Sequence, residues 1–185
     1  MSKTGLLIID IQKDYFPGGK MELDGADAAG DHARQALAAF RAKRLPVFHV
    51  KHLSVRPGAT YFIPGSPGVE IHPAVAPAAG EPVIEKNFPN SFRGTTLKAE
   101  LERSGVDSLV VAGMMTHMCV DASVRAAFDD GYRVTLLADA CATRAQAWGG
   151  ESVPAKQVHV AFLAALGAVY AKILNTAAFI PTIQE

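Results

Sequence analysis

A cysteine at the start of a predicted helix is the residue in this chain whose surroundings most favour chemistry. The apolar run 109–112 lacks alternation, which is typical of a strand buried on both faces, and it stops at Gly113. Thr116 is the predicted N-cap of the helix that follows, so Cys119 falls at its third position. Unpaired N–H groups and the helix dipole stabilise a thiolate there. A buried, inert cysteine explains the local pattern equally well.

Two charged residues also stand at the ends of predicted strands. Asp10 follows the apolar run 6–9, and Lys86 ends the short strand 82–86. A carboxylate can take a proton from a thiol and a cation favours the thiolate, so the two residues would activate a cysteine brought beside them. Each also has an ordinary explanation, because such a carboxylate often caps the next helix and such a lysine is often a solvated surface charge.

The order of the elements indicates how these side chains are positioned. Strand-like runs alternate with helical segments, which predicts a three-layer, doubly wound α/β fold with a six-stranded, mostly parallel sheet and helices on both faces. Ligands bind such sheets at the carboxyl ends of the strands, where Asp10, Lys86 and the Cys119 turn would meet. The predicted strands are 6–10, 46–50, 82–86, 109–112, 132–140 and 168–173, and the predicted helices are 26–43, one capped by Thr95 or Thr96, one from Thr116 to the stop at Gly131, and 153–166.

Three further features follow from the same patterns. The helix after Thr116 is expected to bury Val120, Val124, Ala127 and Phe128. The segment 54–80 is rich in Pro and Gly and shows neither the helical nor the strand periodicity of apolar residues, so it is predicted to be a long loop. The Trp148-Gly149-Gly150 sequence is predicted to break the chain before the last helix.

Length, charge and cysteine content narrow the range of functions. At 185 residues the chain is predicted to be a single domain, 1–185, and eighteen basic residues balance eighteen acidic ones. With no basic excess there is no electrostatic footprint for nucleic acid and no sign of a membrane surface, so the expected partner is a small molecule. Two cysteines, with no signal peptide and no membrane-spanning stretch, predict a cytoplasmic location.

No cofactor is expected. Neither G-x-G-x-x-G nor a P-loop sequence follows the first strand, which disfavours the usual nucleotide-binding sites. His49, His52 and His72 would suggest a metal, but they lack the fixed spacing of a ligand set. Ordinary loop and strand histidines are the favoured interpretation, and no metal is predicted.

Four short motifs stand in order along the chain, and they read LIIDIQ at 7–12, EKNFPNSF at 85–92, GMMTHMCV at 113–120 and DACAT at 139–143. In this order they resemble the isochorismatase-like cysteine hydrolase superfamily, which includes nicotinamidases, carbamoylsarcosine amidases and true isochorismatases. The resemblance covers nearly the whole chain. It implies a six-stranded, mostly parallel sheet, a catalytic triad of Asp10, Lys86 and Cys119, and a cis peptide bond between Met114 and Met115.

The residues and the resemblance agree on one mechanism. Asp10 accepts the thiol proton, Lys86 and the helix terminus favour the thiolate, and Cys119 attacks an amide or related carbonyl. The backbone N–H groups of Met115 and Cys119 are expected to form the oxyanion hole. Asp10 then returns its proton to the leaving ammonia or amine, and water hydrolyses the thioester.

Departures from better-known relatives bear on the substrate. Nicotinamidases carry an Asp-x-His metal cluster after the second strand, where this chain has only His49-Val50-Lys51-His52. Many relatives have asparagine or aspartate where this chain has His117. The candidate pocket wall consists of Phe16, His52, Phe62, Asn90, His117 and Trp148, each of which could equally be packing or a lid contact.

The leading hypothesis is hydrolysis of a small amide, ureido compound or imide. Isochorismatases proper cleave a vinyl ether and do not need a cysteine nucleophile, so Cys119 favours an amidase. The alternatives are a vinyl-ether hydrolase and a catalytically silent member that binds a small molecule or a partner in the same cleft. Because relatives commonly form dimers or larger assemblies, a homo-oligomer is expected.

Overall fold

A central parallel sheet organises the structure, a computed structural model that describes residues 3–183. Its six strands lie in the order β3-β2-β1-β4-β5-β8, and every neighbouring pair is parallel. The strands are β1 (Thr4–Ile9), β2 (Val47–His52), β3 (Val83–Lys86), β4 (Ser108–Met114), β5 (Arg133–Ala142) and β8 (Lys172–Leu174). Strand order reverses beside β1, as the predicted doubly wound fold requires. The predicted fold class is confirmed.

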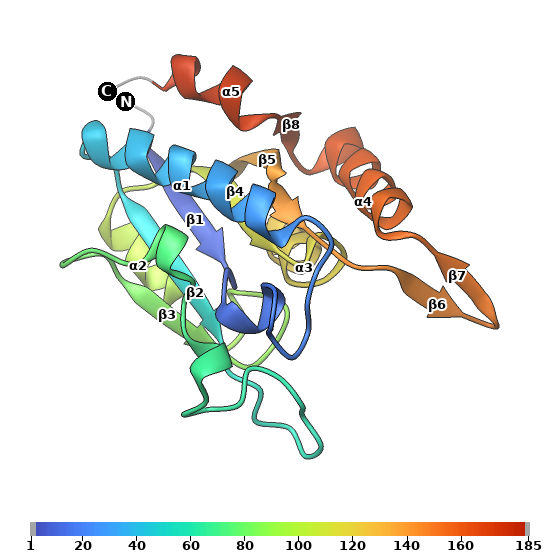
Figure 1. The fold of residues 1–185 in the computed structure, drawn as a ribbon. Helices are drawn as coiled ribbons and strands as arrows, with labels where there is room; N and C mark the ends of the chain where they lie inside the picture. The colour runs from blue at the N-terminus through green and yellow to red at the C-terminus, as the bar shows by residue number, and fades with distance from the viewer. Residues whose placement is uncertain (1–2, 184–185) are drawn as a thin grey trace.

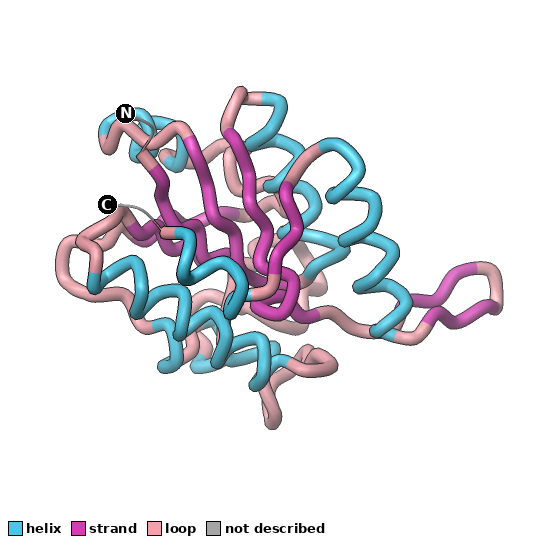
Figure 2. Tube along the Cα trace, turned by 90° about the horizontal axis from the view of Figure 1, so that it is seen from above, coloured by secondary structure: helices cyan, strands magenta, loops and turns pink. Residues whose placement is uncertain are grey.

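Helices cover both faces of this sheet (Figures 1 and 2). On one face lie α1 and the short α5, which contribute to the same apolar cluster. On the other face lie α2, α3 and α4, whose buried side chains form a second cluster. The helices are α1 (Ala26–Ala42), α2 (Leu97–Arg103), α3 (Asp121–Asp129), α4 (Ala155–Val169) and α5 (Thr176–Phe179).

The strand β1 shows why both faces need cover. Leu6 and Ile8 pack into the cluster beneath α1, whereas Leu7 and Ile9 pack into the cluster beneath α2 to α4. Successive side chains of a strand point to opposite faces, so a continuous apolar run is stable only between two layers. Burial of this run fixes the register that carries Asp10 to the end of β1.

The predicted N-cap of the helix that contains Cys119 is wrong. Thr116 is the first residue of a π-helical turn, Thr116–Val120, that runs directly into α3, and Met115 stands at the cap position. The Thr116 hydroxyl instead donates to the carbonyl of Ala142, at 3.2 Å, and so ties the turn to β5. Cys119 therefore lies in the first turn, one place later than predicted.

Two further predictions about α3 have different outcomes. The helix ends before Gly131, whose φ of 89° suits glycine, as predicted. Phe128 is 41% exposed, although the helical periodicity of apolar residues predicted that it would be buried. It lies against Tyr170 at the end of α4 with ring centroids 5.3 Å apart, so it packs at the edge of the layer rather than in the core.

The segment after β5 also differs from the prediction. The Trp148-Gly149-Gly150 break is the tip of a hairpin formed by β6 (Gln146–Trp148) and β7 (Glu151–Val153), which projects from the body of the molecule (Figure 1). Two glycines with positive φ form its turn, as tight hairpins require. The last strand is shorter than predicted because the apolar, helix-compatible sequence lets α4 continue to Val169.

The segment 54–80 is a long loop, as predicted, with two short 3-10 turns, Pro67–Val69 and Pro73–Val75. The buried Gln12 side chain fastens it beside the strand ends, because its amide donates to the carbonyls of Val69 and His52 at 2.7 and 3.0 Å. The loop is thereby held over the carboxyl ends of β1 and β2. None of the helices within residues 3–183 is long and apolar enough to cross a membrane.

Candidate active site

Asp10 begins the site at the carboxyl end of β1. It is fully buried and has a positive φ of 52°, a conformation that aspartate tolerates better than most residues. Its backbone N–H donates to the carbonyl of Val50 at 3.0 Å, which continues the pairing of β1 with β2. The carboxylate therefore sits at the end of the sheet, out of contact with bulk solvent.

Lys86 connects the site, because its ammonium group contacts three side chains. Its Nζ lies 2.6 Å from Oδ2 of Asp10, 3.2 Å from Sγ of Cys119 and 3.0 Å from Nδ1 of His52. The β2–β3 register pairs His52 with Lys86, which explains why these two meet. An ammonium group has donors and no acceptor, so the His52 Nδ1 accepts from it, while the contact with Asp10 is an ion pair.

Cys119 reaches the same point from β4. The peptide bond between Met114 and Met115 is cis, and the π-helical turn that follows brings Cys119, only 4% exposed, over the strand ends. The structure thus brings Asp10, Lys86 and Cys119 together from strands far apart in sequence. This is the convergence that the strand ends predicted.

The protonation states follow from burial and from the neighbouring charges. Burial, and then the Asp10 carboxylate, raise the pKa of the Cys119 thiol far above its usual value, and Lys86 only partly opposes them. Burial lowers the pKa of Lys86, but its ion pair with Asp10 and its contact with Cys119 together outweigh burial, so that the net shift is upward. At neutral pH the site holds a thiol and an ammonium, which corrects the expectation of a thiolate favoured at rest.

His52 is neutral in this arrangement. Burial, followed by the charge of Lys86, lowers its pKa from 6.5 to about 4. The proton of the neutral ring is on Nε2, because Nδ1 accepts from Lys86. His52 therefore serves as a fixed acceptor that orients the lysine.

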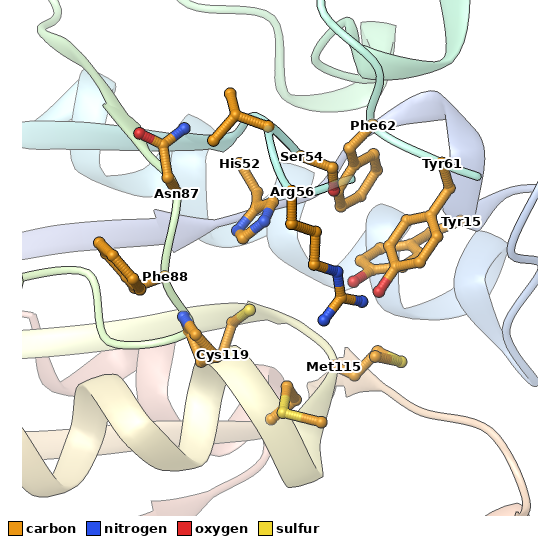
Figure 3. A pocket seen from close by; sticks show the side chains of 13 residues that line it. Tyr15, His52, Ser54, Arg56, Tyr61, Phe62, Asn87, Phe88, Met115 and Cys119 are labelled. Atoms are coloured by element: carbon orange, nitrogen blue, oxygen red, sulfur yellow. The ribbon is translucent and has the colours of Figure 1, made fainter. Parts of the chain in front are cut away.

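A cavity of about 380 Å³ opens beside Cys119 (Figure 3). This volume suits a small molecule. Its floor is Cys119 with Met115 and Met118, and its other walls are Tyr15 and residues of the loops after β2 and β3. Those loop residues are His52, Ser54, Val55, Arg56, Tyr61, Phe62, Asn87, Phe88 and Pro89.

Two of the six residues predicted for the pocket wall lie at this cavity. His52 and Phe62 line the cavity. Phe62 is held in a positive φ of 57°, and its backbone N–H donates to the buried carboxylate of Asp14 at 2.6 Å. Asp14 thus fixes the loop that places the Phe62 ring against the cavity.

The other four predicted pocket residues lie elsewhere. Phe16 is buried and stacks on His72 with ring centroids 3.7 Å apart, so it is core packing. The side chain of Asn90 accepts from the N–H of Phe92 at 2.8 Å and shapes its own turn. His117 points away to Thr143, with Nδ1 2.5 Å from the hydroxyl oxygen. Trp148 is 90% exposed near the tip of the hairpin.

Sequence reasoning missed Tyr15, Arg56, Tyr61 and Phe88 on the cavity wall. Arg56 and Tyr61 lie in a loop with no helical or strand periodicity, so no pattern in the sequence marked them, whereas Phe88 stands within the motif at 85–92. Tyr15 also carried a signal, since it stands five residues after Asp10 in the segment that leaves the same strand end.

A metal at this point would compete with the lysine. Among residues 3–183, one group of possible ligands converges, formed by Asp10, His52 and Cys119 with ligand atoms within 4.8 Å of one another. The ammonium of Lys86 contacts all three, and so takes the place of a cation. His49 instead contacts Glu81 at 2.9 Å, and His72 stacks on Phe16, so the three spaced histidines do not form a site.

Comparison with known proteins identifies relatives over almost the whole chain. A family model described as an isochorismatase domain matches residues 4–176. The isochorismatase family protein YddQ of Bacillus subtilis is 49% identical over 96% of this chain and 98% of its own length. Maleamate amidohydrolase of Pseudomonas putida is 32% identical over 77% of this chain and 73% of its own. A crystal structure of a hydrolase of this family from Oleispira antarctica has a TM-score of 0.94, with 45% identity and 97% of both chains covered.

Proposed function

Because the chain belongs to the isochorismatase family of hydrolases, we propose that it hydrolyses a C–N bond of a small molecule through a thioester on Cys119. The bond is that of an amide, a ureido compound or an imide. One observation carries the proposal: the Lys86 ammonium contacts both the Asp10 carboxylate and the Cys119 sulfur at the floor of the cavity. A family relative with an amidohydrolase name supports the same class of bond.

Asp10 is the general base of the first step. It takes the proton from Sγ as the sulfur attacks the substrate carbonyl, so no standing population of thiolate is required. The thiol of high pKa makes this coupling necessary, because the free thiolate would be rare at neutral pH. Lys86 remains an ammonium throughout and stabilises first the carboxylate and then the sulfur as charge moves between them.

The oxyanion of the tetrahedral intermediate requires donors beside Cys119. The backbone N–H groups of Met115 and Cys119 fill this role in the proposal, since the first turn of a helix leaves its N–H groups without partners in the helix. Collapse of the intermediate breaks the C–N bond, and Asp10 returns the proton to the departing ammonia or amine. Asp10 then takes a proton from water, the hydroxide attacks the thioester, and Sγ leaves with that proton.

The alternatives make different demands on the site. A vinyl-ether hydrolase has no use for a sulfur within 3.2 Å of the lysine, and a silent binding protein has no use for the buried ion pair between Lys86 and Asp10. A buried ion pair is costly to desolvate and is weak evidence for stability alone. Its presence against the cysteine favours the enzyme.

A pair of cysteine variants tests the proposal. A panel of small amides, ureido compounds and imides is assayed for ammonia release with the wild type, with Cys119→Ala and with Cys141→Ala, which removes the other buried cysteine, on β5. We expect release by the wild type and Cys141→Ala, loss of at least about a thousandfold in Cys119→Ala, and an acyl adduct on Cys119 in the mass spectrum of quenched protein. Turnover that survives in Cys119→Ala would contradict the mechanism.

Assembly, location and domain organisation complete the proposal. We expect a homo-oligomer, because α4 exposes apolar side chains and carries no charge after Lys156, with Val160 55% and Val169 62% exposed. Light scattering on the wild type and on Val160→Lys tests this expectation, and a monomeric mass for both proteins would contradict it.

The family match to residues 4–176 supports a single domain over 1–185. The two free, buried cysteines accord with a cytoplasmic location.

A further inference from the structure

The cavity beside Cys119 has an excess of positive charge. Behind Cys119 the charges of Asp10 and Lys86 offset each other across 2.6 Å. Arg56 is a further charged residue on the wall, and Figure 3 shows its guanidinium directed toward the hydroxyl groups of Tyr15 and Tyr61. The space available to a substrate is therefore next to a cation that the catalytic pair does not neutralise.

Arg56 has no acidic partner within residues 3–183. Ion pairs with aspartate or glutamate are formed by five other arginines, which are Arg34, Arg41, Arg103, Arg125 and Arg133. A guanidinium presents donors in a planar fork that matches a carboxylate. An arginine on a cavity wall whose guanidinium pairs with no acidic side chain of residues 3–183 is suited to an anionic ligand.

The two tyrosines add neutral donors at the same place. Burial is the main cause that raises the pKa of Tyr15 and of Tyr61, so both hydroxyls stay protonated at neutral pH. Both rings line the cavity, and their centroids lie 6.2 Å apart. A carboxylate held by Arg56 would have hydroxyl donors beside it as well as the guanidinium.

We propose that the substrate carries a carboxylate, which Arg56 binds while Cys119 attacks the carbonyl of its amide. The apolar side chains of Phe62, Phe88 and Met118 line the cavity as well and suit a short hydrocarbon segment between the two groups. The substrate class is thus a small amide with a carboxylate at its far end. This identification of the reacting amide rests on the proposed function, whereas the anion site does not.

Alkylation of Cys119 tests the anion site without any turnover. Iodoacetate and iodoacetamide are nearly the same size and differ in charge, and each forms a thioether at Sγ with loss of iodide and of the thiol proton. Rates are measured by mass spectrometry on the peptide that contains Cys119, in the wild type, Arg56→Met, Arg56→Lys and Arg34→Met. Arg34 is the matched control, because it is an exposed arginine on α1 that pairs with Asp31.

We expect the iodoacetate-to-iodoacetamide rate ratio to fall about tenfold in Arg56→Met, to be largely kept in Arg56→Lys and to be unchanged in Arg34→Met. Raising the salt from about 0.05 M to about 0.5 M should also lower the ratio in the wild type, because salt screens the attraction. A ratio that does not change in Arg56→Met, or that falls equally in Arg34→Met, would overturn the anion site.

A second measurement separates this proposal from the proposed function. Succinamate, which carries a carboxylate, and butanamide, which does not, are compared as substrates. Hydrolysis of succinamate by water yields succinate and ammonia, and Arg56→Met should raise the KM for succinamate about tenfold more than it raises the KM for butanamide. If neither amide is hydrolysed while the alkylation ratio depends on Arg56, the reaction is wrong and the anion site stands. If both are hydrolysed equally well and Arg56→Met changes neither KM, the anion site is wrong and the hydrolase stands.

Discussion

The imidazole Nδ1 of His52 lies 3.0 Å from the ammonium nitrogen of Lys86. The lysine can only donate, so His52 must offer a lone pair and stay neutral. Together with the ion pair to Asp10 and the hydrogen bond to Cys119, this contact holds the ammonium group in place. His52 is thus a positioning residue for the catalytic pair.

The lowered pKa of His52 predicts how stability depends on pH. The folded value of about 4 lies below the unfolded value of 6.5, so the unfolded chain binds more protons between these limits. The free energy of unfolding therefore falls as the pH drops from 6.5 to 4. In His52→Asn, whose amide oxygen can still accept from Lys86, this fall should be smaller. Urea unfolding of both proteins at several pH values measures the difference. If the free energy of unfolding depended on pH identically in the two proteins, the lowered pKa assigned to His52 would be contradicted.

Removing the charge of Asp10 should separate thiol reactivity from catalysis. The Asp10 carboxylate is one cause of the raised pKa of Cys119, so Asp10→Asn should lower that pKa and speed alkylation by iodoacetamide at pH 7.5 at least about fivefold. The same variant lacks the base and the proton donor to the leaving group, and amide hydrolysis should fall at least about a hundredfold. If alkylation slows together with hydrolysis, Asp10 does not raise the pKa of the thiol.

Asp14 should prove important for the cavity although it does not line it. Its carboxylate accepts from the N–H of Phe62 at 2.6 Å and of Lys20 at 3.2 Å, and it is only 4% exposed. Asp14→Ala should lower the free energy of unfolding by about 2 to 3 kcal/mol, the range for losing hydrogen bonds to a charged group. It should also speed hydrogen exchange at the Phe62 amide.

The control for Asp14 is Asp31→Ala. Asp31 pairs with Arg34 on the exposed side of α1 and should contribute no more than about 0.5 kcal/mol to the free energy of unfolding. Equal effects of the two substitutions on urea unfolding would refute the role assigned to Asp14.

Gly113 should not tolerate a side chain. A Cβ at this position would clash with the backbone carbonyl of Ile9 on the neighbouring strand, and its φ of 153° disfavours other residues. Gly113→Ala should cost at least about 3 kcal/mol of stability, since backbone cannot move aside. Gly167→Ala is the contrast, because its Cβ would meet a side-chain atom of Ile173 rather than backbone, and alanine favours the helix. Thermal unfolding of both variants measures the difference, and similar melting temperatures would contradict it.

Much of the fold was predictable because strands and helices are marked by patterns among residues that are close in sequence. The strands β1, β2, β4 and β5 contain apolar runs that alternate with helical segments, and this alternation predicts a parallel sheet. The end of the chain was predicted less well. Its residues 153–173 are almost uniformly apolar, so period alone did not mark where α4 ends, and the hairpin before α4 has only its two glycines as a signal.

The sequence by itself determined that Asp10, Lys86 and Cys119 would meet, because residues after parallel strands share one edge of the sheet. Only the tertiary structure decided what surrounds them. His52 contacts Lys86 through strand register, and Arg56, Tyr61 and Phe62 reach the cavity through a loop that the distant carboxylate of Asp14 holds in place. Positions in regular elements follow from periodicity along the chain, whereas the path of an irregular loop depends on contacts between residues far apart in sequence. The raised pKa of Cys119 has the same origin, since burial and Asp10 outweigh the helix terminus that the sequence pattern marks.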